Sequence, residues 1–247
     1  MKLFKLLIFS SVIFLFSACC SSNFSGSLTQ ISTIDALLDG VYDGRVTCGK
    51  LKEYGDFGIG TFDGLDGEMI VLNGQVYQVK IDGKAYLVAD SMRTPFASVL
   101  FFNSEKSIEM PSGLNYDQLK ARIDKLIKSD NLFYAIKIEG KFKKMITRSV
   151  PKQKKPYPQL KEVVKHQKVF KFGETSGTVV GFRSPQYVKG LNVTGYHLHY
   201  LTDNKKAGGH ILDFVTDITQ FSVILNKSSI SFDLKIKTIL LKYHNFL

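Results

Sequence analysis

The chain has 247 residues, of which 44% are hydrophobic and 22% are charged, and its formal net charge is +11. This composition excludes a chain that is disordered throughout, and the length allows one sizeable core or two small packed domains. The three cysteines imply neither a disulfide framework nor a cysteine-rich metal site. A net positive charge can favour nucleic-acid binding, but the sequence contains no nucleic-acid-binding motif, so we expect no nucleic-acid partner.

Residues 1–19 resemble an export signal. Two lysines precede an apolar run over residues 6–18, which is shorter than the roughly 20 residues that a transmembrane helix needs. The small residues before Cys19 resemble a bacterial lipoprotein processing site, at which that cysteine carries lipid. We therefore expect an exported protein that meets a membrane only through a lipid anchor on Cys19, with plain secretion as the alternative. Residues 20–31 are polar and are expected to form a tether.

Short strands dominate the pattern that follows. Ser32 or Thr33 can cap a helix over residues 34–39. Between residues 57 and 88, three apolar runs are separated by Asp-Gly and Asn-Gly pairs, which tolerate the positive φ of tight hairpin turns. We expect an antiparallel meander there, with strands at residues 68–72, 75–81 and 84–88, and a buried strand at 96–102.

The second half predicts two helices among further strands. Asn115 caps a helix to about Lys128, with Leu119, Ile123, Leu126 and Ile127 on one face. A short helix is expected over residues 159–165. Strands are expected at 132–139 and 141–147, paired around Gly140, and at 178–182, 195–201, 210–215 and 221–225.

These elements predict an α+β fold of mixed α/β character, in which two mixed β-sheet subdomains pack together with few helices. The prolines near residue 151 suggest a division there. We expect an N-terminal β-meander subdomain over residues 32–150 and a C-terminal zinc-binding subdomain over 151–247.

Three of the five histidines lie close together in the sequence, as His197, His199 and, after two glycines, His210. Side chains at positions i and i+2 of a strand share a face. If the chain reverses about the bond between Asn204 and Lys205, His199 lies directly opposite His210. Three converging neutral imidazoles that leave an open position are typical of a catalytic Zn²⁺ site.

Four separated motifs resemble those of the α-acetolactate decarboxylases. They read Gly58-Ile59-Gly60-Thr61-Phe62, Leu65-Asp66-Gly67-Glu68-Met69, Thr147-Arg148-Ser149-Val150-Pro151, and Gly195-Tyr196-His197-Leu198-His199 with Gly208-Gly209-His210. The resemblance covers roughly residues 32–225 in consistent order. It implies an α/β fold of two mixed-sheet domains and a homodimer.

The resemblance also implies which residues act. The three histidines would bind zinc, Glu68 would lie near the metal, Arg148 would be an active-site arginine, and Thr61 would contact the substrate. The implied reaction is the decarboxylation of 2-acetolactate to acetoin and CO₂ by a carboxy-lyase. Taken without the resemblance, Glu68 and Arg148 are interpreted more simply as an exposed carboxylate and a surface charge.

The implied chemistry suits these residue types. Loss of CO₂ from a β-keto acid develops negative charge on the ketone oxygen, which a Lewis-acid metal stabilises, so no organic cofactor is required. Arg148 can orient the substrate near its departing carboxylate, and Glu68 can bind the metal or carry a proton. Two alternatives remain open: another zinc enzyme, such as a metal-hydroxide hydrolase, and a non-catalytic zinc-binding surface lipoprotein.

The C-terminal residues depart from the family pattern. Related proteins usually end in an acidic tail that returns a second glutamate to the metal site, whereas residues 233–247 contain no glutamate and only one acid, Asp233. We expect zinc to bind but decarboxylation to be reduced.

Overall fold

The computed structural model describes residues 27–103 and 106–233. The export signal and the residues after Asp233 lie outside the described residues. Within the described part of the chain, no helix combines the length and the apolar character needed to cross a membrane.

Six strands form a first sheet that contains the predicted meander. In spatial order they are β1 (Ser27–Ile31), β8 (Ala97–Leu100), β3 (Phe57–Thr61), β4 (Glu68–Leu72), β5 (Gln75–Val79) and β6 (Ala85–Leu87). The strand predicted over residues 68–72 is confirmed with both of its boundaries. Asn73 and Gly74, between β4 and β5, both have positive φ, at 52° and 72°, which is the backbone that a two-residue hairpin turn requires.

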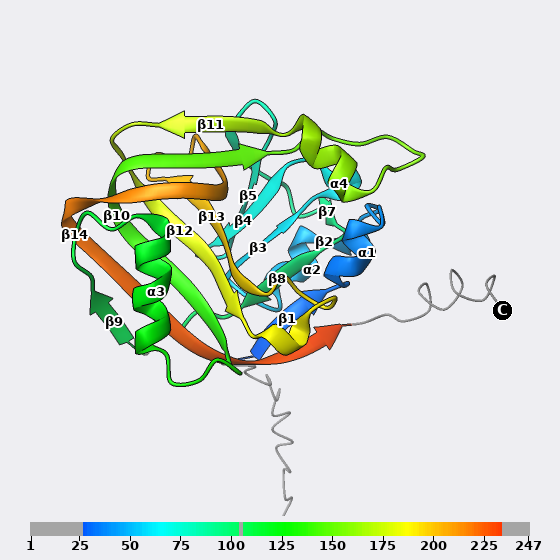
Figure 1. Cartoon of the computed structure of the whole chain (residues 1–247). Coiled ribbons are helices and arrows are strands. Elements are labelled where there is room, and N and C mark those ends of the chain that lie inside the picture. Colours follow the sequence, from blue (N-terminus) through cyan, green and yellow to red (C-terminus); the bar gives the residue numbers. More distant parts are fainter. Residues whose placement is uncertain (1–26, 104–105, 234–247) are drawn as a thin grey trace, which may run out of the picture.

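The remaining long strands form a small barrel with two flanking strands (Figure 1). They are β9 (Lys106–Glu109), β10 (Phe133–Ser149), β11 (Lys168–Phe172), β12 (Thr175–Ser184), β13 (Gly195–Thr202) and β14 (Gly208–Asp233). β10 pairs with β12, β12 with β13, β13 with β14, and β14 pairs back with β10, so these four strands close a ring. β11 extends the ring along β10, and β9 extends it along β14.

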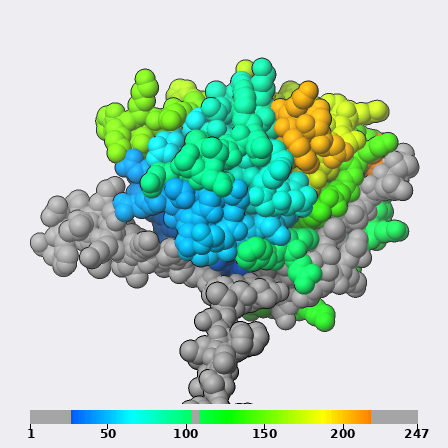
Figure 2. Space-filling view, turned by 180° about the vertical axis from the view of Figure 1, so that it is seen from behind, coloured from blue at the N-terminus to red at the C-terminus, as the bar shows by residue number. Residues whose placement is uncertain are grey.

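Short helices, 3₁₀ turns and a small sheet connect the long strands. The helices are α1 (Ile34–Leu38), α2 (Cys48–Lys52), α3 (Tyr116–Leu126) and α4 (Leu160–Val163), with 3₁₀ turns at η1 (Asp63–Leu65), η2 (Val164–His166) and η3 (Gln186–Val188). β2 (Val46–Thr47) and β7 (Arg93–Thr94) form a separate two-stranded sheet. Figure 2 shows the opposite side of the molecule, where the residues of the N-terminal half, blue to cyan, occupy the centre of the face.

The helix caps follow the predicted chemistry. The Thr33 hydroxyl accepts a hydrogen bond from the backbone N–H of Ala36 at the start of α1. Asn115 and Gln118 form a reciprocal capping box at the start of α3. α3 buries Leu119 and Ile123 against the barrel, whereas Leu126, predicted on the same face, is exposed because the helix ends there.

The first sheet and the barrel pack face to face. Their shared core includes Phe57, Ile59 and Ile70 from the sheet together with Val180, Phe182 and Leu201 from the barrel. The mostly β architecture with few helices confirms the predicted fold class.

Three local expectations differ from the structure. Residues 27–31, expected in the tether, form strand β1, because β8 and β14 pair with them on both sides. Gly140 does not end a strand, because it is paired with Gly177 and Phe221 inside the continuous strand β10. The sheets do not divide at residue 150, since β9 and β10 pair with the strands of the C-terminal half.

Candidate metal centre

The three clustered histidines converge in the space between the first sheet and the barrel. His199 on β13 lies directly opposite His210 on β14, which confirms the predicted register, and His197 shares the face of His199. One ring nitrogen from each histidine lies within 4.8 Å of the others. The ring centroids are 5.0–5.3 Å apart.

Two glycines before His210 allow the strands to approach closely. A Cβ atom on Gly208 would lie 2.1 Å from the carbonyl oxygen of Tyr200, and one on Gly209 would lie 2.6 Å from that of Arg148. Gly209 also has a φ of 133°, which a residue with a side chain rarely adopts. Only glycine therefore lets β14 pass between β13 and β10, and this places His210 opposite both His199 and Arg148.

Backbone from the first sheet fixes the ring of His199. Its Nδ1 lies 2.8 Å from the carbonyl oxygen of Met69 on β4 and must donate to it, because a carbonyl only accepts. The proton is therefore on Nδ1, and Nε2 carries a free lone pair. That Nε2 and the Nδ1 of His210 are buried and have no hydrogen-bond partner among the described residues. Buried polar atoms without partners are costly, and a metal ion would satisfy both.

Burial keeps all three rings neutral. Burial and, to a lesser extent, the nearby Arg148 charge together lower the pKa of His197 to about 3. Burial, with repulsion from the neighbouring positive charges, also lowers the pKa of His199 and of His210 well below the usual range of imidazole. Neutral imidazole is the form that binds a metal, so the donor set fits a metal ion.

A carboxylate and a guanidinium complete the cluster. Glu68 begins β4 and is 6% exposed. Its Oε1 accepts a hydrogen bond from Arg148 Nη1 at 2.9 Å, and its Oε2 lies 3.5 Å from His199 Nε2. Burial raises the pKa of Glu68, and the Arg148 charge opposes that rise. Glu68 is thus a carboxyl group that can hold a proton closer to neutral pH than an exposed one.

Thr61 lies beside this cluster but is already engaged. It pairs with Glu68 across β3 and β4, and its hydroxyl donates to the carbonyl oxygen of Gly67 at 2.7 Å. Its one side-chain proton is thus used in the turn before β4.

Two structural partners in the matched motifs had no predicted role. The Met69 carbonyl fixes His199, and the Thr147 hydroxyl donates to the Gly208 carbonyl oxygen at 2.7 Å. The residue types do not predict these contacts, because each acceptor is a backbone carbonyl that lies far along the sequence from its donor.

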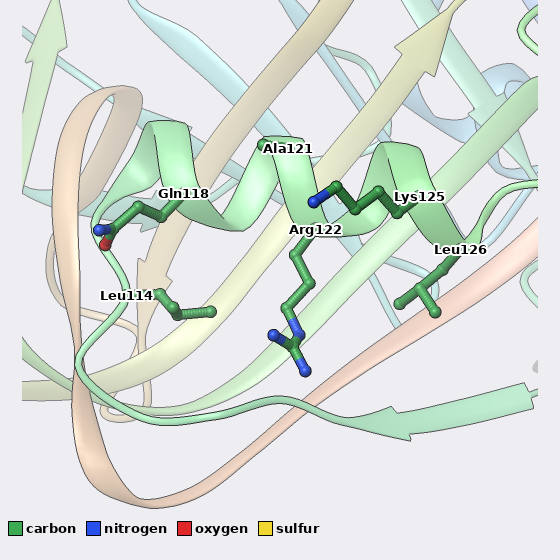
Figure 3. Close-up of a pocket in the computed structure, with 6 residues that line it drawn as sticks. All are labelled: Leu114, Gln118, Ala121, Arg122, Lys125 and Leu126. Carbon is green, nitrogen blue, oxygen red and sulfur yellow. The ribbon is translucent and has the colours of Figure 1, made fainter.

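A pocket of about 510 Å³ lies elsewhere, along α3 (Figure 3). It is lined by Leu114, Gln118, Ala121, Arg122, Lys125 and Leu126, none of which belongs to the histidine cluster.

Comparison with known proteins agrees with the site. The family model described as Alpha-acetolactate decarboxylase matches residues 28–235. A relative of that name from Methanosarcina mazei is 53% identical over 193 residues, covering 78% of this chain and 67% of its own. One from Methylococcus capsulatus is 49% identical over 185 residues, covering 75% and 71%.

A solved structure gives the same result. The crystal structure of alpha-acetolactate decarboxylase from Bacillus subtilis strain 168 superposes with a TM-score of 0.81 at 38% identity, over 86% of this chain and 92% of that one. With a family model that spans most of its length, relatives at about half identity and a matching three-dimensional structure, the chain belongs to the alpha-acetolactate decarboxylase family.

Proposed function

We propose that this chain is a zinc-dependent decarboxylase that converts 2-acetolactate to acetoin and CO₂. The observation that carries the proposal is the set of three converging neutral histidines, of which the fully buried His199 lies against the Glu68–Arg148 pair. The names of the relatives supply the substrate.

His197, His199 and His210 would hold the metal. Three imidazole donors favour Zn²⁺ over the harder cations Mg²⁺ and Ca²⁺, which prefer oxygen ligands. When bound, Zn²⁺ supplies a Lewis acid that stabilises negative charge on the substrate's ketone oxygen.

The protein groups then have separate tasks. In the reaction the bond between C2 and the carboxylate carbon breaks, CO₂ leaves, and the electron pair stays on the substrate as an enolate. A proton added to C2 completes acetoin, so the reaction consumes one proton overall. Arg148, whose guanidinium is always charged, would orient the anionic substrate. Glu68, whose pKa is raised by burial, would deliver the proton.

Thr61 would contribute less directly. Its hydroxyl proton is donated to Gly67, but the oxygen retains a lone pair that can accept from a substrate hydroxyl. Thr61 would therefore contact the substrate as a hydrogen-bond acceptor.

A colorimetric acetoin assay on the purified protein with racemic 2-acetolactate tests the reaction, together with elemental analysis of the bound metal. Ester and amide substrates run in parallel separate this activity from a zinc hydrolase. Acetoin release with one zinc per chain is expected. A zinc-loaded protein that releases no acetoin would contradict the proposed reaction.

We also propose, from the sequence, an exported homodimer anchored by lipid on Cys19. Light scattering on the purified protein should give twice the chain mass. Mass spectrometry of the mature N-terminus should find the lipid on Cys19, and an unmodified N-terminus at another residue would rule the anchor out.

A further inference from the structure

The strand that carries two of the histidines is held unequally along its length. From His199 to Leu201, β13 pairs with β12 on one side and β14 on the other. From Gly195 to Leu198 it pairs with β12 alone among the described residues, because after His210 β14 turns to pair with β10, as Ile211 does with Thr147. The backbone of His197 is therefore held from one side only.

The ring of His197 also lacks a fixing contact. His199 donates to the Met69 carbonyl, but in the described part of the chain no hydrogen bond is made by either ring nitrogen of His197. A metal ligand without a second hydrogen bond depends on its backbone for its direction.

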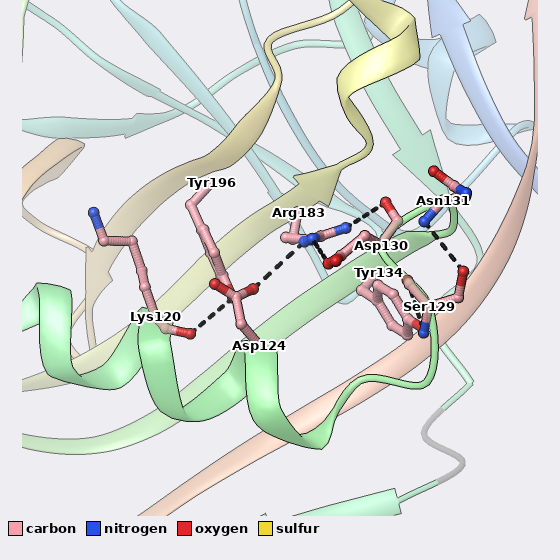
Figure 4. A network of polar contacts seen from close by, with 8 residues as sticks. All are labelled: Lys120, Asp124, Ser129, Asp130, Asn131, Tyr134, Arg183 and Tyr196. Carbon is pink, nitrogen blue, oxygen red and sulfur yellow. Dashed lines mark hydrogen bonds and ion pairs between the residues drawn. The ribbon is translucent and has the colours of Figure 1, made fainter.

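The neighbouring Tyr196 supplies an attachment on the other side of the strand (Figure 4). Its hydroxyl donates to Asp124 Oδ1 at 2.7 Å, with the carbonyl oxygen of Lys120 at 3.2 Å. Both acceptors are on α3, which is fixed to the barrel by the fully buried Leu119 and Ile123. The half of β13 with one strand neighbour is thus joined to a helix that packs against the barrel.

A second contact braces the same connection. Arg183 on β12 lies directly opposite Tyr196, and its guanidinium hydrogen-bonds Asp130 and lies 3.6 Å from Asp124. Asp124 on α3 therefore contacts both β12, through Arg183, and β13, through Tyr196, the residue that precedes His197.

We propose that Tyr196 is a positioning residue for the metal centre, holding the one-sided half of β13 so that the imidazole of His197 meets those of His199 and His210. Side chains alternate along a strand, so a fixed Tyr196 on the α3 side sets the direction of His197 on the opposite side. The inference rests on the proposed metal site and assigns Tyr196 no contact with the substrate.

Tyr196→Phe tests this role because it removes only the hydroxyl and leaves the half-buried ring packed against the core. Tyr134→Phe is the matched control: its hydroxyl also bonds near α3, to the carbonyl of Ser129 at 3.3 Å, but from β10. Zinc affinity is measured by chelator competition. Tyr196→Phe should weaken it about tenfold, the lower end for a lost orienting partner, whereas Tyr134→Phe should leave it unchanged.

Two changes at the exposed helix position Asp124 provide an independent test, including the case in which Tyr196→Phe does not fold. Asp124→Ala removes the acceptor and should weaken zinc binding as Tyr196→Phe does. Asp124→Asn keeps an acceptor oxygen and should retain most of the affinity. Equal zinc affinity in wild type and Tyr196→Phe, or an equal loss in both phenylalanine variants, overturns the positioning role.

Hydrogen exchange of the zinc-free protein separates this inference from the proposed function. In Tyr196→Phe, the amides of residues 195–198 should exchange faster, while those of 199–201, paired on both sides, should not change. Unchanged exchange at 195–198 overturns the inference whether or not zinc binds. Failure of the wild-type protein to bind zinc would instead overturn the proposed function, and the positioning role with it.

Discussion

The Nδ1 of His199 on β13 lies 2.8 Å from the backbone carbonyl of Met69 on β4, so the first sheet fixes the tautomer of a histidine in the barrel. Met69 follows Glu68, whose carboxylate also faces His199. The hairpin between β3 and β4 therefore delivers two contacts to the histidine cluster.

The histidines should be necessary for metal binding individually. His197→Ala and His199→Ala should each lose the zinc, because two imidazoles cannot replace three ligands. His166→Ala, at an exposed position outside the cluster, is the control and should keep it. Elemental analysis after dialysis measures the content, and full zinc in both site variants would exclude this ligand set.

Arg148 should act on turnover rather than on the metal. Arg148→Ala is expected to reduce decarboxylation by about 10²-fold, the usual effect of removing one polar group that stabilises reacting charge, while the zinc content stays unchanged. Arg122→Ala on the exposed face of α3 removes a surface charge as a control. Steady-state kinetics decide the point, and wild-type turnover in Arg148→Ala would remove this residue from the mechanism.

The Arg148 charge should also affect the pH profile through Glu68. The charge opposes the rise that burial causes in the pKa of Glu68. Its loss in Arg148→Ala should raise that pKa further, so that Glu68 stays protonated to higher pH. The residual activity should therefore persist to higher pH than that of wild type, and Arg148→Lys, which keeps a positive charge, should resemble wild type. A profile in Arg148→Ala that is unmoved or shifted to lower pH would contradict this coupling.

Gly209 should tolerate no side chain. Gly209→Ala combines positive φ with a clash against the Arg148 carbonyl, and should destabilise the protein by more than about 3 kcal/mol. Gly74 also has positive φ but no atom within 4 Å of an added Cβ, so Gly74→Ala should cost only about 1 kcal/mol. Urea unfolding compares the two, and equal effects would show that the close approach of β14 is not limiting.

Cys48 should be inert in the folded protein. The side chain is fully buried, and burial, aided by the Asp90 charge, raises the pKa of the thiol to about 11. At pH 8 only about one molecule in a thousand would carry the reactive thiolate, against roughly a quarter for an ordinary cysteine. Iodoacetamide labelling with peptide mapping should modify Cys48 only in urea, and rapid labelling of the native protein would contradict this burial.

The local elements and the histidine register were predictable from the sequence because their determinants are neighbours along the chain. The Asn-Gly turn fixes the hairpin of β4 and β5, and the short return after β13 places His199 opposite His210. The closure of the barrel was not predictable, because β10 and β14 are far apart in the sequence and no local pattern predicts their pairing.

The same limit applies to the site. Glu68 and Arg148 are 80 residues apart and touch only because the sheet packs against the barrel. The residues alone gave them no role; the family resemblance selected them. The prediction of a strand boundary at Gly140 was wrong. A glycine locally favours a turn, but Gly140 lies inside β10 with strand partners on both sides.

The parallel pairing of β1 with β14 has a consequence for biosynthesis. Ser27 pairs with Ser229 and Ile31 with Asp233, so the earliest described strand is completed by the latest. While the chain is still on the ribosome, β1 presents an unpaired edge that another chain could occupy. Nascent chains stalled before residue 208 should therefore be cut by protease within residues 27–31, and chains released at full length should resist. Among the described strands, β1, which joins the sheet to the barrel, is therefore translated first but gains its β14 partner last.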